Sequence, residues 1–131
     1  MVSSGRRDLR SYSPLTLAYI GDGVYELIIR TILVKKGNCP VNRLHKKASS
    51  LVKAGPQSAI MEVIEEKLTP EELSVNRRGR NAHWPTMAKH TTMADYRRAT
   101  GFEALMGYLY FKGGLHTDAR LVRMGIGEDI L

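Results

Sequence analysis

Two acidic residues lie within the most apolar segments of this 131-residue chain. Asp22 stands between two glycines in Leu17–Leu27, and Glu103 has a similar setting in Gly101–Gly107. An ionised carboxylate that is buried in an apolar helix is costly unless something compensates its charge. Mg²⁺ and Mn²⁺ prefer hard oxygen ligands, and the chain is otherwise rich in Arg and Lys. Asp22 and Glu103 therefore predict a metal site that faces an anionic substrate.

A divalent metal at this position would suit the hydrolysis of a phosphodiester. Such an ion activates water and neutralises the charge that builds up on the phosphate. The glycines around each acid remove side-chain bulk, so that a phosphate or a neighbouring helix can approach closely. The alternative is that Asp22 is a helix acid that reaches solvent or pairs with Arg30. Glu26 lies one turn after Asp22, and pairing with Arg30 explains it more simply than a role beside the site does.

The second group of candidate residues is a basic segment between residues 77 and 98, in which only Asp95 is acidic. Guanidinium groups bind phosphate bidentately, and a Trp side chain can stack beside a base. A further basic cluster lies on the polar face of an expected helix. The predicted nucleic-acid-binding residues are Arg77, Arg78, Arg80, His83, Trp84 and Lys89 of the segment, with Lys46 and Lys47 of the cluster. The alternative for both groups is a plain solvated surface.

The composition is that of a globular protein with a polyanionic partner. The net charge of +7 favours nucleic acid ahead of an acidic membrane surface, the alternative being a merely soluble basic protein. Cys39 is the only cysteine, so the chain has no intramolecular disulfide and no cysteine-based zinc site. We find neither a signal peptide nor a segment of transmembrane length. These features predict a cytoplasmic protein with no membrane partner.

The elements that must position these residues are helices, because strand signals are nearly absent and apolar residues recur at helical spacing. Ser13 and Pro14 predict the start of the first helix, Asn42 is expected to cap the second, and Thr69 with Pro70 predicts a strong restart. Six helices are expected, at about residues 14–36, 43–54, 56–68, 70–76, 92–113 and 117–124. We therefore predict a single all-α domain over residues 1–131, with residues 1–12 as a flexible tail.

The region that follows the fourth helix is expected to be a long basic loop. The helix should fray into Asn76–Asn81, and the next residues, to about Thr92, contain Pro85 and no clean period. In this loop Gly79 would let the backbone approach a groove. The predicted arginines would then sit on a loop rather than on a helix.

Several motifs resemble those of the ribonuclease III family. Ile20-Gly21-Asp22, followed by an apolar turn, resembles its signature motif, and Phe102–Tyr110 resembles its second acidic motif. The chain is further similar to the short, stand-alone Mini-III branch of the family in residues 17–22, Leu44–Ala48 and Arg77–Ala82. The resemblance covers the chain from about residue 14 to residue 114. The motifs are specific in combination, whereas Gly-Asp alone would be weak.

The resemblance implies a compact all-α fold and an obligate homodimer, whose groove is lined by acidic sites. It implies Mg²⁺-dependent hydrolysis of double-stranded RNA with a staggered cut that leaves 5′-phosphates, Mn²⁺ being an alternative ion. Asp22 and Glu103 would be the catalytic, metal-binding carboxylates, and the basic residues would bind RNA. The branch is associated with maturation of large-subunit ribosomal RNA, so a precursor of that RNA is the expected substrate, and a ribosomal protein that presents it is a candidate partner. The branch lacks a separate double-stranded-RNA-binding domain, for which this chain leaves no room.

Two positions depart from the wider family. Ala18 replaces a glutamate one turn before the signature aspartate, and Thr100 replaces an aspartate three residues before the second glutamate. The short branch shares both changes, which leave two strong metal ligands per subunit and leave the number of ions open. The main alternative is a non-catalytic ribosome- or RNA-binding protein of the same fold. A helical DNA-binding module ranks lower, because no helix-turn-helix pattern is present.

Overall fold

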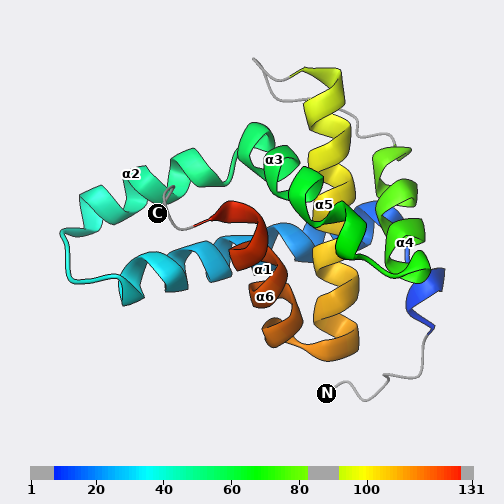
Figure 1. The fold of residues 1–131 in the computed structure, drawn as a ribbon, viewed down its shortest axis with the longest axis horizontal. Coiled ribbons are helices and arrows are strands. Elements are labelled where there is room, and N and C mark those ends of the chain that lie inside the picture. The colour runs from blue at the N-terminus through cyan, green and yellow to red at the C-terminus, as the bar shows by residue number, and fades with distance from the viewer. Residues whose placement is uncertain (1–7, 83–91, 128–131) are drawn as a thin grey trace.

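The described parts of the chain fold into helices, and short connections join α1 to α2, α2 to α3 and α5 to α6 (Figure 1). The computed structural model describes residues 8–82 and 92–127, and within these ranges it contains no strand. The elements are a 3-10 helix at Leu9–Ser11, α1 (Pro14–Lys35), α2 (Val41–Leu51), α3 (Ala54–Ile64), a 3-10 helix at Glu65–Lys67, α4 (Pro70–Arg80), α5 (Met93–Gly113) and α6 (Leu115–Ile126). The predicted all-α class is confirmed. Among the described helices, none combines the length and the apolar character needed to cross a membrane.

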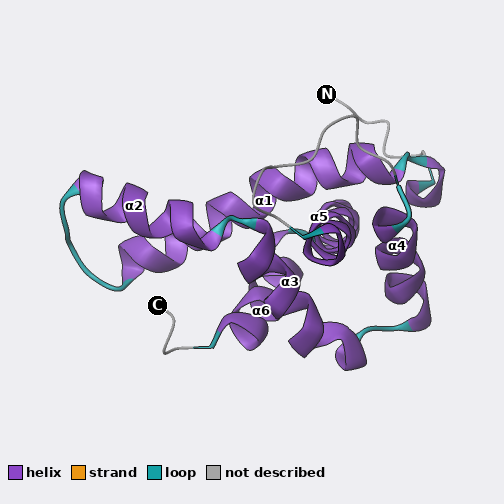
Figure 2. Ribbon diagram, turned by 90° about the horizontal axis from the view of Figure 1, so that it is seen from above, coloured by secondary structure: helices purple, strands orange, loops and turns teal. Residues whose placement is uncertain are grey.

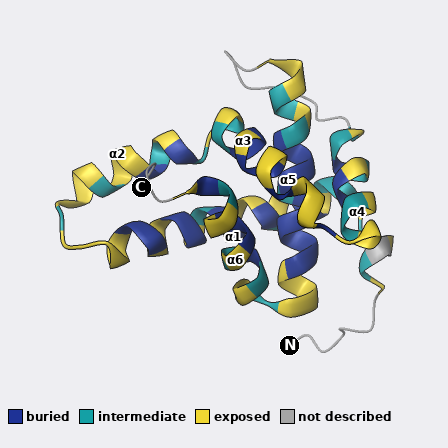
Figure 3. Cartoon of the chain, viewed as in Figure 1, coloured by how far each residue is buried: buried dark blue, intermediate teal, exposed yellow. Residues whose placement is uncertain are grey.

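Helix α5 forms the centre of the domain. Figure 2 shows it almost end-on, with α1, α3, α4 and α6 around it. The middle of α5 is buried on nearly every side (Figure 3), and Phe102, Leu105 and Met106 are fully covered. Tyr25 of α1 packs edge-on against Phe102, with their ring centroids 5.3 Å apart. A helix that is apolar all round is stable only in such a central position, and α1, α3, α4 and α6 pack against it.

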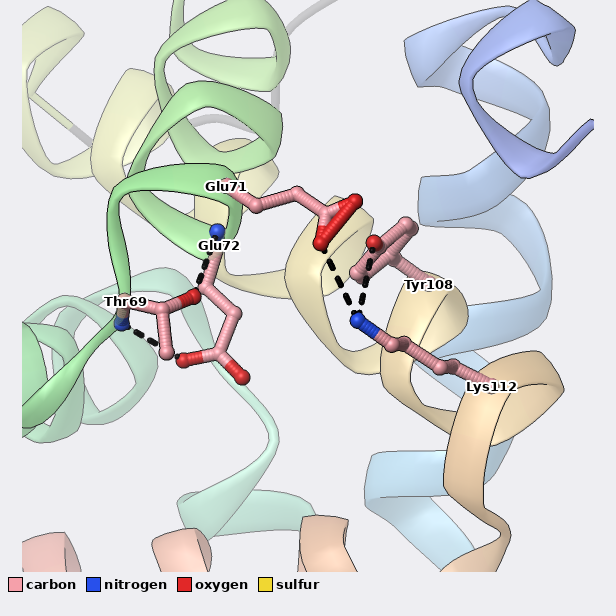
Figure 4. Close-up of polar contacts among 5 residues, drawn as sticks. All are labelled: Thr69, Glu71, Glu72, Tyr108 and Lys112. Carbon is pink, nitrogen blue, oxygen red and sulfur yellow. Dashed lines mark hydrogen bonds and ion pairs between the residues drawn. The ribbon is translucent and has the colours of Figure 1, made fainter.

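The predicted helix starts at residues 14 and 70 are confirmed. They could be predicted because their capping signals are local. Ser13 accepts a hydrogen bond from the backbone N–H of Leu15. Thr69 and Glu72 form a reciprocal capping box at the start of α4, shown in Figure 4. Near the same end of α4, Lys112 of α5 forms a 3.0 Å ion pair with Glu71 (Figure 4). Each cap satisfies backbone donors that the helix leaves without partners.

Other predicted boundaries are shifted. Helix α2 begins at Val41, one residue before Asn42, and its cap position is Pro40, which makes no side-chain bond. Helix α3 begins at Ala54, so that Pro56 lies within its first turn instead of opening it. Helix α6 begins directly after Gly114, whose φ of 84° allows an abrupt change of direction between α5 and α6. The sequence places these three helices correctly but misplaces their starts by two residues and their C-terminal ends by up to four.

The expected fraying of α4 is wrong. The helix continues through Asn76 to Arg80, so the predicted arginines lie on its last turns and not on a loop. Asn76 and Gly79 are buried, and Gly79 faces α5. A Cβ added at Gly79 would come within 2.9 Å of the Cα of Gly101. Close packing on α5 therefore holds the end of α4 in helical form, and Gly79 serves this contact rather than an open groove.

The second half of α1 and helix α2 project together from the rest of the molecule (Figure 1). Exposed residues predominate on the outer part of α2 (Figure 3), which packs mainly against α1. The hydroxyl of Tyr25 donates a 2.7 Å hydrogen bond to the carbonyl of Leu51, and so ties the inner end of α2 to α1. At the N-terminus, Leu9 and Tyr12 of the segment expected as a tail pack against the core.

Candidate active site

Helices α1 and α5 pack so closely that their backbones touch at two glycines. A Cβ added at Gly21 would lie 1.7 Å from the carbonyl oxygen of Glu103, and one added at Gly107 would lie 2.0 Å from that of Leu17. Figure 2 shows α5 end-on and α1 lying across it, so the two helices cross steeply and touch at this crossing. Because no other residue fits at these positions, the glycines bring Asp22 and Glu103 into the same site.

The two carboxylates lie in contact at the edge of the core. Glu103 is half-buried, whereas Asp22 is exposed. Three effects together raise the pKa of the Glu103 carboxyl to about 8. Burial is the largest, followed by the charge of Asp22 and a side-chain hydrogen bond with Asp22. The expectation that Asp22 is buried in an apolar helix is wrong. Gly21 faces α5 in its place, and Asp22 is turned toward solvent.

A third polar side chain reaches the site from α3. Gln57, only 2% exposed, donates a hydrogen bond from Nε2 to Oε2 of Glu103 over 3.2 Å. This contact lowers the pKa of Glu103 and opposes the larger effects of burial and Asp22. Sequence reasoning missed Gln57. The available signal was a polar residue on the otherwise apolar face of α3 that carries Ile60, Met61 and Ile64.

Two tyrosines also border Glu103. Burial, and secondarily the negative charge of Glu103, raise the pKa of Tyr25 far above its usual value. The same two causes raise the pKa of Tyr96, one turn before Thr100 on α5. Both phenols therefore remain protonated at neutral pH. They line a site whose electrostatics are dominated by its carboxylates.

The two positions that depart from the wider family show how the acidic site is limited to two members. Ala18 is buried in the core at 1% exposure. Thr100 is also buried, and its hydroxyl donates a 2.9 Å hydrogen bond to the carbonyl of Tyr96. Within residues 8–82 and 92–127, no group of three or more His, Cys, Asp or Glu side chains is arranged to hold a metal ion. Any cation here would be held by Asp22, Glu103 and water.

Glu26 does not belong to this site. It forms a 2.6 Å ion pair with Arg30, and both side chains are exposed. The interpretation of this pair as an ordinary i,i+4 contact is confirmed, and an exposed pair of this kind contributes only about 0.3–0.5 kcal/mol. Asp22, for which pairing with Arg30 was the alternative, contacts Glu103 instead.

The arginines of α4 lie beside the part of α5 that carries Glu103. Gly79 packs on Gly101, and a Cβ added at Gly101 would meet Cγ of Arg80 at 2.6 Å. The aliphatic stem of Arg80 therefore crosses α5 two residues before Glu103. Arg77 is exposed, whereas the Arg78 guanidinium donates to the carbonyl of Tyr12 over 3.3 Å.

Two of the remaining predicted binding residues, Lys46 and Lys47, are not gathered at this point. Lys46 and Lys47 are exposed on α2, at the opposite end of the molecule from α4 in both Figure 1 and Figure 2. His83, Trp84 and Lys89 lie outside the described residues. The nearby Arg98 is directed to α3, where it contacts Ser58 at 3.2 Å and Glu62 at 3.3 Å.

The chain is similar in sequence to proteins of a known family. A sequence profile of the ribonuclease III domain matches residues 15–114. A Clostridium tetani protein named Mini-ribonuclease 3 is 48% identical over 117 residues, which cover 88% of this chain and 76% of the relative. A Thermoanaerobacter protein of the same name is 50% identical over 116 residues, covering 88% and 82%.

A solved structure has the same fold. A crystal structure of a protein from Fusobacterium nucleatum superposes with a TM-score of 0.79 at 30% identity, covering 89% of this chain and 93% of the other. The matched profile includes both Asp22 and Glu103, the two acids that the crossing of α1 and α5 brings together. The chain belongs to the ribonuclease III family.

Proposed function

We propose that this ribonuclease cleaves double-stranded RNA endonucleolytically, with Asp22 and Glu103 as its catalytic carboxylates and Mg²⁺ as its metal. The observation that carries the proposal is the contact between these two acids at the crossing of α1 and α5. Two carboxylates in contact repel each other when both are ionised, and a divalent cation relieves that repulsion. Their oxygen atoms are also the donors that Mg²⁺ and Mn²⁺ prefer.

The donor set fits such an ion, because one carboxylate is exposed to the substrate side and the other is anchored. When bound, a divalent metal would polarise the scissile phosphate and lower the pKa of water. Asp22, being exposed, would meet metal and phosphate from the solvent side. Glu103, held by Gln57, would supply the fixed ligand. Water and phosphate oxygens would complete the coordination, since Mg²⁺ takes only one or two protein carboxylates in many sites.

The basic residues would bind the RNA backbone next to this site. Arg80 and the exposed Arg77 lie at the end of α4 that packs on Gly101, two residues before Glu103 in α5, and they would contact phosphates flanking the cut. We assign the same role to Arg78, and to His83, Trp84 and Lys89 in the following segment. Lys46 and Lys47 would contact a more distant part of the duplex. Phosphate contacts give affinity with little sequence information, so recognition would rest mainly on the A-form shape.

The physiological substrate that we propose is a precursor of large-subunit ribosomal RNA, processed in the cytoplasm. This proposal rests on the similarity to the Mini-III branch and on relatives that carry the name Mini-ribonuclease 3. A ribosomal protein that presents the RNA remains a candidate partner.

We also propose that the chain acts as a homodimer. Tyr19 is 78% exposed and lies one turn before Asp22 on α1. We place the interface at this position beside the candidate site, and a two-fold dimer would match the pseudo-symmetry of duplex RNA. Light scattering on the purified protein should give a dimer mass for the native chain and a monomer mass for Tyr19→Glu. Val63→Glu, at another exposed apolar position on α3, should remain a dimer.

Cleavage of a long RNA duplex with Mg²⁺ tests the catalytic assignment. The native chain is compared with Asp22→Asn and Glu103→Gln, with binding measured in parallel by fluorescence anisotropy. The native chain should cut duplex RNA but not duplex DNA, and both variants should bind RNA without cutting it. Full activity of either variant would refute the role of that carboxylate. If all three proteins bind and none cuts even a ribosomal precursor with ribosomal proteins present, the non-catalytic alternative would be favoured.

A further inference from the structure

Gln57 is a polar side chain in a place where the fold has no structural need for one. It is 2% exposed, on the face of α3 that packs toward α5. Burying an amide costs free energy unless its groups are hydrogen-bonded. A methionine or leucine would fill the same volume without that cost. The one described side chain with which the structure pairs its amide nitrogen is Glu103.

Other contacts between α3 and α5 fix the position of Gln57. The next residue, Ser58, is equally buried, and its hydroxyl accepts a 3.2 Å hydrogen bond from Arg98 of α5. Arg98 also contacts Glu62, one turn farther along α3. The backbone that carries Gln57 is therefore fixed relative to α5 independently of the bond between Gln57 and Glu103.

The direction of this hydrogen bond determines how the carboxylate lies. The amide nitrogen contacts Oε2 of Glu103 over 3.2 Å. A glutamate side chain has several rotatable bonds and loses rotamer freedom when it is fixed. With Oε2 already held by the protein, this ordering is complete before a metal arrives. The carboxylate then presents its coordinating face in a constant direction beside Asp22.

We propose that Gln57 is the positioning residue of the site: it orients the Glu103 carboxylate so that Glu103 and Asp22 bind one divalent metal together. The inference rests on the proposed function, because it takes Glu103 to be a metal ligand. Removing a hydrogen-bond partner of a metal-binding carboxylate typically weakens metal affinity or activity about 10- to 100-fold. We expect a loss in this range for the protein without RNA, where no substrate contact contributes.

Calorimetric titration of the full-length protein with Mn²⁺, in the absence of RNA, tests this role. Gln57→Met keeps the length and volume of the side chain but removes the donor. Ser58→Ala is the matched control, because it removes a hydrogen bond from an equally buried neighbour that does not contact Glu103. Thermal denaturation verifies that both variants are folded. We expect Gln57→Met to bind Mn²⁺ about 10- to 100-fold more weakly, and Ser58→Ala to bind it like the native chain.

Adding Glu103→Gln and the double variant separates this inference from the proposed function. If Glu103 is a ligand and Gln57 acts through it, Glu103→Gln loses the metal and Gln57→Met has no further effect in that background. Native affinity in folded Gln57→Met, combined with loss in Glu103→Gln, would overturn the role of Gln57 and leave the proposed function standing. Native affinity in Glu103→Gln would overturn both. Equal losses in Gln57→Met and Ser58→Ala would show a general packing effect and would also refute the positioning role.

Discussion

Asp118 is a buried carboxylate whose cost to the fold can be measured. It lies in the first turns of α6 with 0% exposure, and neither carboxylate oxygen has a hydrogen-bond partner among the described residues. Burial raises the pKa of its carboxyl from 3.8 to about 8. The folded protein therefore keeps Asp118 protonated at neutral pH, whereas the unfolded chain releases the proton. Asp118→Asn keeps the shape of the side chain and removes this linkage to pH.

The magnitude follows from the two pKa values. Because the folded-state pKa is the higher one, the folded state binds more protons than the unfolded state between about pH 4 and pH 8. The stabilisation is fully present below the unfolded pKa and is lost as pH rises toward the folded pKa. Each unit of pKa difference corresponds to about 1.4 kcal/mol. Between about pH 5 and pH 7, this single residue should reduce the free energy of unfolding by about 3 kcal/mol.

Denaturant unfolding, followed by far-UV circular dichroism in metal-free buffer, measures the effect. The free energies of unfolding of the native chain and Asp118→Asn are compared at several values between about pH 5 and pH 7. The difference between the two free energies of unfolding should change by about 3 kcal/mol over this range, in favour of the variant. A constant offset would report only the cost of burying the amide. Glu103 titrates in both proteins, so its contribution cancels in the difference between their free energies of unfolding. Parallel stability curves would refute the assignment of a neutral, buried Asp118.

Three further predictions concern the site and the helices that carry it. Gly21→Ala should abolish cleavage and lower the melting temperature, because its Cβ would lie 1.7 Å from the Glu103 carbonyl oxygen; Gly55→Ala, where no atom lies within 4 Å, should do neither. Thr69→Ala should lower the free energy of unfolding by about 1 kcal/mol through loss of the capping box, and an unchanged denaturation midpoint would contradict this. In the absence of RNA, metal affinity should increase and fewer protons should be released on binding as the pH rises toward 8, because Glu103, with its pKa raised to about 8, must lose its proton to bind the metal. Calorimetry in buffers of different ionisation enthalpy would measure both effects, and an affinity that does not depend on pH would count against the prediction.

The sequence alone determined the fold class and the helix starts that depend on local signals. Thr69 and Glu72 satisfy each other within one turn, so their effect is independent of the remaining chain. The end of α4 was missed because it depends on a distant helix. The local sequence of Asn76–Arg80 does not decide whether the helix ends or continues. The packing of Gly79 on Gly101 favours its continuation.

The candidate site divides in the same way. Two acids with flanking glycines in apolar segments were enough to select Asp22 and Glu103 and to predict chemistry for them. Only the tertiary structure decided that they meet, that Asp22 faces solvent, and that Gln57 contacts Glu103. Sequence patterns report which residues share a helix face, because that periodicity is local. The neighbours of a face on another helix depend on where the backbones can approach, which Gly21 and Gly107 determine here across α1 and α5.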